Sequence, residues 1–115
     1  DVFISLHMQM ATKEKDSRGL QIFYSTDQKS EEVRGASYQL ANSLFNGLSS
    51  NQKLIVLENL NVPLMVLRTP QVPAVLLQLG FLTDKGDLSS VYHREHLEFI
   101  ANVIYRSATE LSISK

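Results

Sequence analysis

Two polar side chains close short apolar runs of this sequence, and each could present a polar group to a ligand. His7 follows the run Val2–Leu6, and Gln78 follows the run Val75–Leu77. A histidine can bind a metal or carry a proton, whereas a glutamine carboxamide can only donate and accept hydrogen bonds. Polar groups at the C-terminal ends of covered strands are where an open α/β sheet meets its ligands. The pair defines a candidate site, while a hydrogen-bonded histidine at a strand end stays an open interpretation of His7 alone.

The two apolar runs predict strands that carry these residues. Val75–Leu77 is apolar without alternation, which is typical of a strand covered on both faces. Pro73 fits the start of that strand because proline cannot donate to a ladder, and Gly80 predicts a turn soon after Gln78. Val2–Leu6 predicts a second covered strand that ends on His7.

Further strands are expected between these two. Arg18–Ser25 alternates, with Leu20, Ile22 and Tyr24 on one face, and predicts a strand with one face better covered. Leu64–Arg68 predicts another covered strand, preceded by a connection over 59–63. The run Leu54–Leu57 fits either a short strand or a loop packed on the core.

Two amphipathic helices complete the predicted elements. The first begins at Glu31, with Ser30 as its N-cap, and ends near Leu48. The second is expected within Leu88–Leu111. The predicted core stripe of the first helix consists of Val33, Ser37, Leu40, Ala41, Leu44, Phe45 and Leu48, and that of the second of Leu97, Ile100, Ala101, Ile104, Ala108 and Leu111.

Composition limits the possible functions. The chain has 115 residues, 43% of them apolar, and a net charge of −1, which suits one domain over residues 1–115. Because no basic stripe is present, nucleic acid is not an expected partner, and no run is long enough for a membrane span. The absence of cysteine excludes disulfides and thiolate metal sites. His93 and His96 lie one helical turn apart, a spacing that can chelate a metal, but a charged surface turn is the commoner explanation.

The sequence around the two candidate residues resembles a known family, the zinc-dependent N-acetylmuramoyl-L-alanine amidases of bacterial cell walls. Pro73-Ala74-Val75-Leu76-Leu77 and Gly80-Phe81-Leu82 match the family's last strand, which reads approximately P-A-V-L-V-E-x-G-F-L-S-N. Asp1, Phe3, Ser5 and His7 match a family strand of the form D-x-F-x-S-I-H. The resemblance implies an α/β fold with a mixed, mostly covered sheet and helices packed on its faces, a truncated phosphorylase/hydrolase-like amidase fold.

The resemblance also implies roles for individual residues. His7 stands where the family has a zinc-ligand histidine, and Gln78 stands where it has its catalytic glutamate. Gln9, Arg68 and Asp84 fall at positions of the family's motifs that imply contact with substrate. In the amidases zinc polarises a water, and the glutamate acts as general base and acid while the bond between muramic acid and L-alanine is cut.

Two departures from the family pattern suggest that this chain is inactive. Gln78 cannot accept a proton as a carboxylate does. The family's N-terminal strands and its first two zinc ligands have no counterpart here, so no cofactor is expected in this chain although zinc belongs to the family. The resemblance therefore covers nearly all of the chain but only the later part of a family domain.

Three functional hypotheses remain open. The chain is expected to be an inactive amidase-like domain that serves as a binding or regulatory module, a fragment or inactivated variant of a working amidase, or a degenerate domain kept for structural reasons in an envelope protein. The expected partners are peptidoglycan or a glycopeptide, another protein, or a second copy paired through the Val2–Leu6 edge. The resemblance implies the cell envelope, periplasm or extracellular space, and the chain shows no targeting signal of its own.

Overall fold

A computed structural model describes residues 1–9, 19–25, 27, 30–68, 71–81 and 93–113. Its strands and helices, in chain order, are β1 (Phe3–Gln9), β2 (Gln21–Tyr24), α1 (Glu31–Ser49), β3 (Leu60–Asn61), α2 (Met65–Arg68), β4 (Ala74–Phe81) and α4 (Arg94–Ile113). The strands form one mixed sheet in the order β1-β4-β2-β3. The mixed α/β class expected from the sequence is confirmed.

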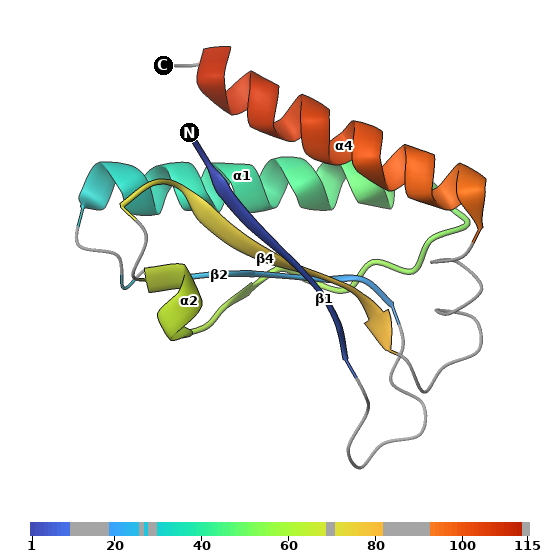
Figure 1. Cartoon of the computed structure of the whole chain (residues 1–115), viewed down its shortest axis with the longest axis horizontal. Coiled ribbons are helices and arrows are strands. Elements are labelled where there is room, and N and C mark those ends of the chain that lie inside the picture. Colours follow the sequence, from blue (N-terminus) through green and yellow to red (C-terminus); the bar gives the residue numbers. More distant parts are fainter. Residues whose placement is uncertain (10–18, 26, 28–29, 69–70, 82–92, 114–115) are drawn as a thin grey trace.

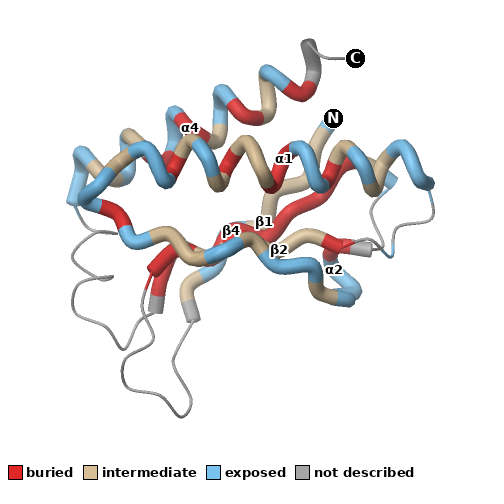
Figure 2. Tube along the Cα trace, turned by 180° about the vertical axis from the view of Figure 1, so that it is seen from behind, coloured by how far each residue is buried: buried red, intermediate tan, exposed pale blue. Residues whose placement is uncertain are grey.

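The two long helices cover one face of the sheet, and α2 lies on the other (Figure 1). Val75 and Leu77 of β4 point toward α1 and α4, where they join the main core cluster. Ala74 and Leu76 point the opposite way and pack with Leu67 of α2. β4 is therefore buried on both faces, as its unbroken apolar run predicts, and Figure 2 shows this buried stretch beneath α1.

Strand β2 and helix α1 follow the sequence closely. Leu20 and Ile22 are buried in the main core, while Phe23 points to the α2 side of the sheet. The predicted N-cap is confirmed, because the backbone N–H of Val33 donates to Ser30 Oγ at 3.3 Å. The buried residues of α1 all belong to its predicted stripe; they are Ser37, Leu40, Ala41, Leu44 and Leu48.

The ambiguous segment 54–57 is a loop that makes one bridge to the start of β2. Leu20 donates to the carbonyl of Ile55, and Leu57 donates to the carbonyl of Leu20, each at 2.8 Å. Leu54 itself is buried in the main core. The segment is therefore a loop packed on the core, with a single strand-like bridge to Leu20.

The expected strand Leu64–Arg68 is wrong, because this segment contains the helical turn α2. Leu67 donates to the carbonyl of Leu64 at 3.0 Å, and Leu67 alone is fully buried while Leu64, Met65 and Val66 are exposed. A short apolar run does not distinguish a strand from a buried helical turn. The strand expected there lies earlier in the chain, as β3, within the segment that was expected to be only a connection.

The expected core stripe of α4 is also partly wrong. Leu97 and Ala101 are exposed, whereas Val103 and Ser107 are buried together with Ile100. The reason is the close approach of α1: a Cβ at Gly47 would lie 2.7 Å from Cγ1 of Val103. Small residues at this contact turn the buried face of α4 away from the most apolar stripe. The part of the expected helix before residue 93 lies outside the described residues.

The contact between α1 and α4 can be tested with two glycine variants of α1. Gly47→Ala is expected to lower the free energy of unfolding by about 1 kcal/mol, since overpacking against the stiff Val103 side chain outweighs the gain in helix propensity. Gly35→Ala, on the same helix with no atom within 4 Å of the new Cβ, is expected to raise it by about 0.5–1 kcal/mol. Urea denaturation of both variants measures the difference. Equal stabilisation by both would contradict the close packing of α1 on α4.

Candidate functional site

The site is built on the parallel pair β1 and β4. Their register places Ser5 opposite Leu76, Leu6 opposite Leu77 and His7 opposite Gln78. Paired residues of neighbouring strands lie about 5 Å apart. Both residues were expected near each other at one edge of the sheet because each closes an apolar run; the register confirms that they are neighbours.

Gln78 lies inside the sheet rather than at its end. It is opposite His7 on one side and opposite Gln21 of β2 on the other, and β4 continues to Phe81. Its side chain shares a face with Leu76, because side chains two positions apart in a strand point the same way. Only 3% of the residue is exposed. The polar residue that was expected at a strand tip is thus held by backbone hydrogen bonds from both sides.

A bulge follows the pair. Between His7 and Gln9, β1 advances two residues while β4 advances three, from Gln78 to Phe81. Gly80 within this bulge has a φ of +150°, a backbone angle that residues other than glycine rarely adopt. Met8 also lines the pocket described below, although alternation along β1 alone would place it on the helix-covered face. The turn predicted from Gly80 is in fact this bulge.

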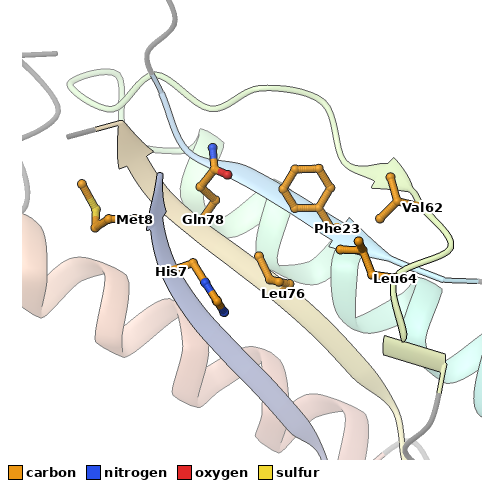
Figure 3. Close-up of a pocket in the computed structure, with 7 residues that line it drawn as sticks. All are labelled: His7, Met8, Phe23, Val62, Leu64, Leu76 and Gln78. Atoms are coloured by element: carbon orange, nitrogen blue, oxygen red, sulfur yellow. The ribbon is translucent and has the colours of Figure 1, made fainter. Parts of the chain in front are cut away.

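His7 is exposed and already has a hydrogen-bond partner. Its Nε2 lies 3.0 Å from Oγ of Ser5, two residues earlier on the same face of β1. Figure 3 shows the imidazole of His7 and the carboxamide of Gln78 leaving their adjacent strands in different directions. The two residues are neighbours in the sheet, but their polar groups do not converge on one point.

A pocket of about 340 Å³ opens beside the two residues on the face opposite the long helices. Most of its lining is apolar and comes from β4, β2 and the segment that leads from β3 into α2 (Figure 3). The described residues that line it are His7, Met8, Phe23, Val62, Leu64, Leu76 and Gln78.

The described residues do not supply the donors of a catalytic zinc site. Such a site needs three protein ligands from histidine, cysteine or carboxylate side chains and one open position. No group of three such side chains comes together within the described part of the chain. At the pocket His7 is accompanied by a neutral carboxamide, so its donor set does not fit the metal.

The remaining residues expected at the site are only partly described. Gln9 ends β1 beyond the bulge and Arg68 ends α2, and the side chains of both lie outside the described residues. Asp84 lies outside them altogether. Their expected contact with substrate stays a prediction.

Sequence reasoning missed the apolar walls of the pocket. The sequence predicts strands for Phe23 and Leu76, a connection for Val62 and a strand for Leu64, but it does not indicate that these residues line a pocket. The alternation of β2 does place Phe23 on the face opposite Leu20 and Ile22. The position of Val62 and Leu64 depends on the unforeseen β3–α2 geometry, which the sequence did not indicate.

The second pair of histidines is separate from this pocket. His93 comes directly before α4 and His96 lies in its first turn, with ring centroids 4.8 Å apart. Neither residue lines the pocket beside Gln78. His96 lies on the last helix, as expected from the sequence, whereas His93 directly precedes that helix.

Comparison with known proteins identifies the class. A model of the N-acetylmuramoyl-L-alanine amidase family, Amidase_3, matches residues 1–110. The chain belongs to this family, whose members are in general zinc-dependent and act on the cell wall. A search of curated proteins gave no match.

Solved structures of such amidases share the fold. An amidase from Clostridium difficile 630 superposes with a TM-score of 0.84 at 23% identity, over 100% of this chain and 59% of that one. Amidase AmiC2 of Nostoc punctiforme superposes with a TM-score of 0.79 at 22% identity, over 99% of this chain and 58% of that one. The catalytic domain of CwlV from Bacillus (Paenibacillus) polymyxa var. colistinus superposes with a TM-score of 0.79 at 24% identity, over 99% of this chain and 59% of that one. The chain therefore has the amidase fold and spans less than two thirds of these relatives.

None of the described helices combines the length and the apolar character that crossing a bilayer requires.

Proposed function

We propose that this domain binds a fragment of peptidoglycan in the pocket beside β1 and β4 and does not hydrolyse it. The observation that carries the proposal is Gln78, which is buried, borders the pocket and stands where the family motif has its catalytic glutamate. Membership of the amidase family supports peptidoglycan as the ligand. The domain then serves as a binding or regulatory module.

The chemistry of the carboxamide argues against hydrolysis. Amide cleavage by water needs a general base to take a proton and a general acid to return it to the leaving nitrogen. A carboxamide is neutral at any physiological pH and does neither. His7, the other polar residue of the pocket, is engaged with Ser5 and points away from Gln78. Among its described residues the site has groups that can bind but no pair that can transfer protons.

The alternative is a fragment or inactivated variant of a working zinc-dependent amidase. It is supported by coverage, because the chain spans 58% of AmiC2 of Nostoc punctiforme and 59% of the Clostridium difficile 630 amidase. In that case the missing zinc donors would come from residues outside this chain. The third possibility, a degenerate domain kept for structural reasons, requires that the pocket binds nothing.

Family membership also supports a location in the cell and the kinds of binding partner. Action on the cell wall supports the bacterial envelope, in the periplasm or outside the cell. A protein partner is supported by the structure of the CwlD amidase from Clostridioides difficile in complex with the GerS lipoprotein, which has the same fold with a TM-score of 0.70.

A cleavage assay with a zinc measurement tests the proposal. The chain is expected to release no L-alanyl peptide from purified peptidoglycan, with or without added zinc, because Gln78 cannot act as a base. Gln78→Glu alone is expected to stay inactive, since the described residues do not supply three zinc ligands. Mass spectrometry of the products and elemental analysis of the dialysed protein are the measurements.

The outcomes separate the proposals. Cleavage by the unaltered chain would show that the non-hydrolytic assignment is wrong. Cleavage by Gln78→Glu, together with stoichiometric zinc that is lost in His7→Ala, would favour the alternative of an inactivated amidase.

Self-association through β1 is a further part of the proposal. In the described structure β1 pairs only with β4, so its outer edge has free backbone groups, and Leu6 beside it is 54% exposed. Such edges recruit another strand. Sedimentation is expected to show a dimer that Leu6→Lys weakens about tenfold or more by placing charge at the edge. Leu97→Lys, on the exposed face of α4, is the matched control and should change nothing.

A monodisperse monomer whose amides of Val2–Leu6 are nevertheless protected from exchange at low concentration would contradict this. It would mean that another part of the same chain covers the edge.

A further inference from the structure

His93 and His96 form a pair of imidazoles at the start of α4, away from the pocket beside Gln78. His93 directly precedes the helix, and its carbonyl accepts from the backbone N–H of Leu97 at 3.1 Å, so the first helical turn holds both residues. Their ring centroids are 4.8 Å apart, with 32° between the ring planes. A spacing of three residues thus brings two potential metal ligands together on one side of the helix.

The separation of the two rings is close to that of imidazoles bound to one metal ion. Zinc lies about 2.0–2.1 Å from a ligating nitrogen, which places it roughly 3.2 Å from the centre of the ring. Two rings that share a tetrahedral ion therefore have centroids about 5 Å apart. The observed 4.8 Å needs only a small adjustment of the two side chains.

One ring nitrogen of the pair lacks a partner. Nδ1 of His96 is buried and makes no hydrogen bond within the described part of the chain. A buried polar atom without a partner costs free energy, which a bound group that supplies the partner recovers. Contact between the two rings leaves this nitrogen unsatisfied, whereas a metal ion accepts the lone pair of a neutral imidazole. The unpaired nitrogen therefore favours a metal site over the charged surface turn that is commoner at such positions.

The charges around the pair permit a cation of modest affinity. A helix N-terminus carries a partial positive charge, which opposes a cation. Arg94 adds a positive charge, but its Nε lies 3.1 Å from Oε1 of Glu98 on the next turn. Glu95 places a further carboxylate in the first turn. The two glutamates thus offset the positive groups at this end of the helix.

We propose that His93 and His96 bind a divalent first-row transition-metal ion. Imidazole nitrogen suits zinc, copper and nickel, whereas magnesium and calcium prefer oxygen ligands. No third histidine or carboxylate joins the pair within the described residues, so water completes the coordination. Two of the four ligands of a structural zinc site predict a dissociation constant on the order of 10–100 µM. The site is separate from the pocket and is independent of the proposed function.

NMR titration with zinc tests the proposal on the labelled 115-residue chain, which contains three histidines. The imidazole resonances of His93 and His96 are expected to move together and to saturate with one dissociation constant. Those of His7 are expected to stay in place at the zinc concentrations that saturate the pair. Magnesium at the same concentrations should move none of them, because it prefers oxygen ligands.

Single replacements distinguish two ligands from one. His93→Gln and His96→Gln are each expected to weaken zinc binding at least about tenfold, because the second ligand of a chelate acts at high effective concentration. Glu98→Gln removes a nearby exposed carboxylate and keeps both imidazoles, so it is the matched control and should change the dissociation constant less than about threefold. Thermal unfolding without zinc identifies any variant that has lost the fold, and the titration of the unaltered chain depends on no variant.

Three results would overturn the site. Movement of only one of the two imidazoles, or of neither, would exclude a shared ion. Full zinc affinity in either His93→Gln or His96→Gln would exclude a chelate. Zinc binding that is lost in His7→Ala and kept in both of those variants would place the ion at the pocket instead. Failure of the pair to bind zinc leaves the proposed binding of peptidoglycan unaffected, because the two sites share no residue.

Discussion

Strand β4 is the element on which the other described elements depend. It pairs with β1 on one side and β2 on the other, and its side chains enter the core on both faces of the sheet. Full burial of a valine or leucine side chain contributes about 1.5–3 kcal/mol, so Val75 and Leu77 alone are a substantial part of what holds α1 and α4 on the sheet. The buried Ser37 of α1 accepts from the backbone N–H of Ala74 at 2.9 Å, which ties the first helix to the beginning of β4. Because Gln78 belongs to this strand, its position is fixed by the core and not by a mobile loop.

Patterns that depend on local residues predicted the structure well. The unbroken apolar run of β4, the alternation of β2 and the Ser30 cap each reflect a constraint that acts within a few residues. The family motif added the pairing of His7 with Gln78, which joins segments far apart in the sequence. What the sequence did not predict depends on packing between elements. The face of α4 is set by the contact of Gly47 with Val103, and the turn α2 by burial of Leu67 alone, and neither is visible in a hydropathy pattern.

In the candidate site, too, some residues could be predicted from the sequence while others depend on packing between elements. His7 and Gln78 could be found because the motif names their positions, but the walls of the pocket come from Phe23, Val62 and Leu64, which the fold of the β3–α2 segment brings there. Their apolar character changes how the site is understood. A neutral amide beside apolar walls can hold a ligand by hydrogen bonds and is poorly suited to break an amide bond. Under the proposed function, an amide at the position where the family motif has its acid cannot transfer a proton and adds a hydrogen-bond donor.

The central claim is that the pocket beside Gln78 binds a fragment of peptidoglycan. The most direct measurement follows the side-chain NH₂ resonances of Gln78, and of Gln39 on the exposed face of α1, while N-acetylmuramoyl-L-alanyl-D-isoglutamine is added to the labelled chain. The account predicts that the Gln78 resonances move and saturate with the same dissociation constant as the backbone amides of β4, while those of Gln39 stay in place. The absence of any saturating movement of the Gln78 side chain and of the β4 amides would contradict it.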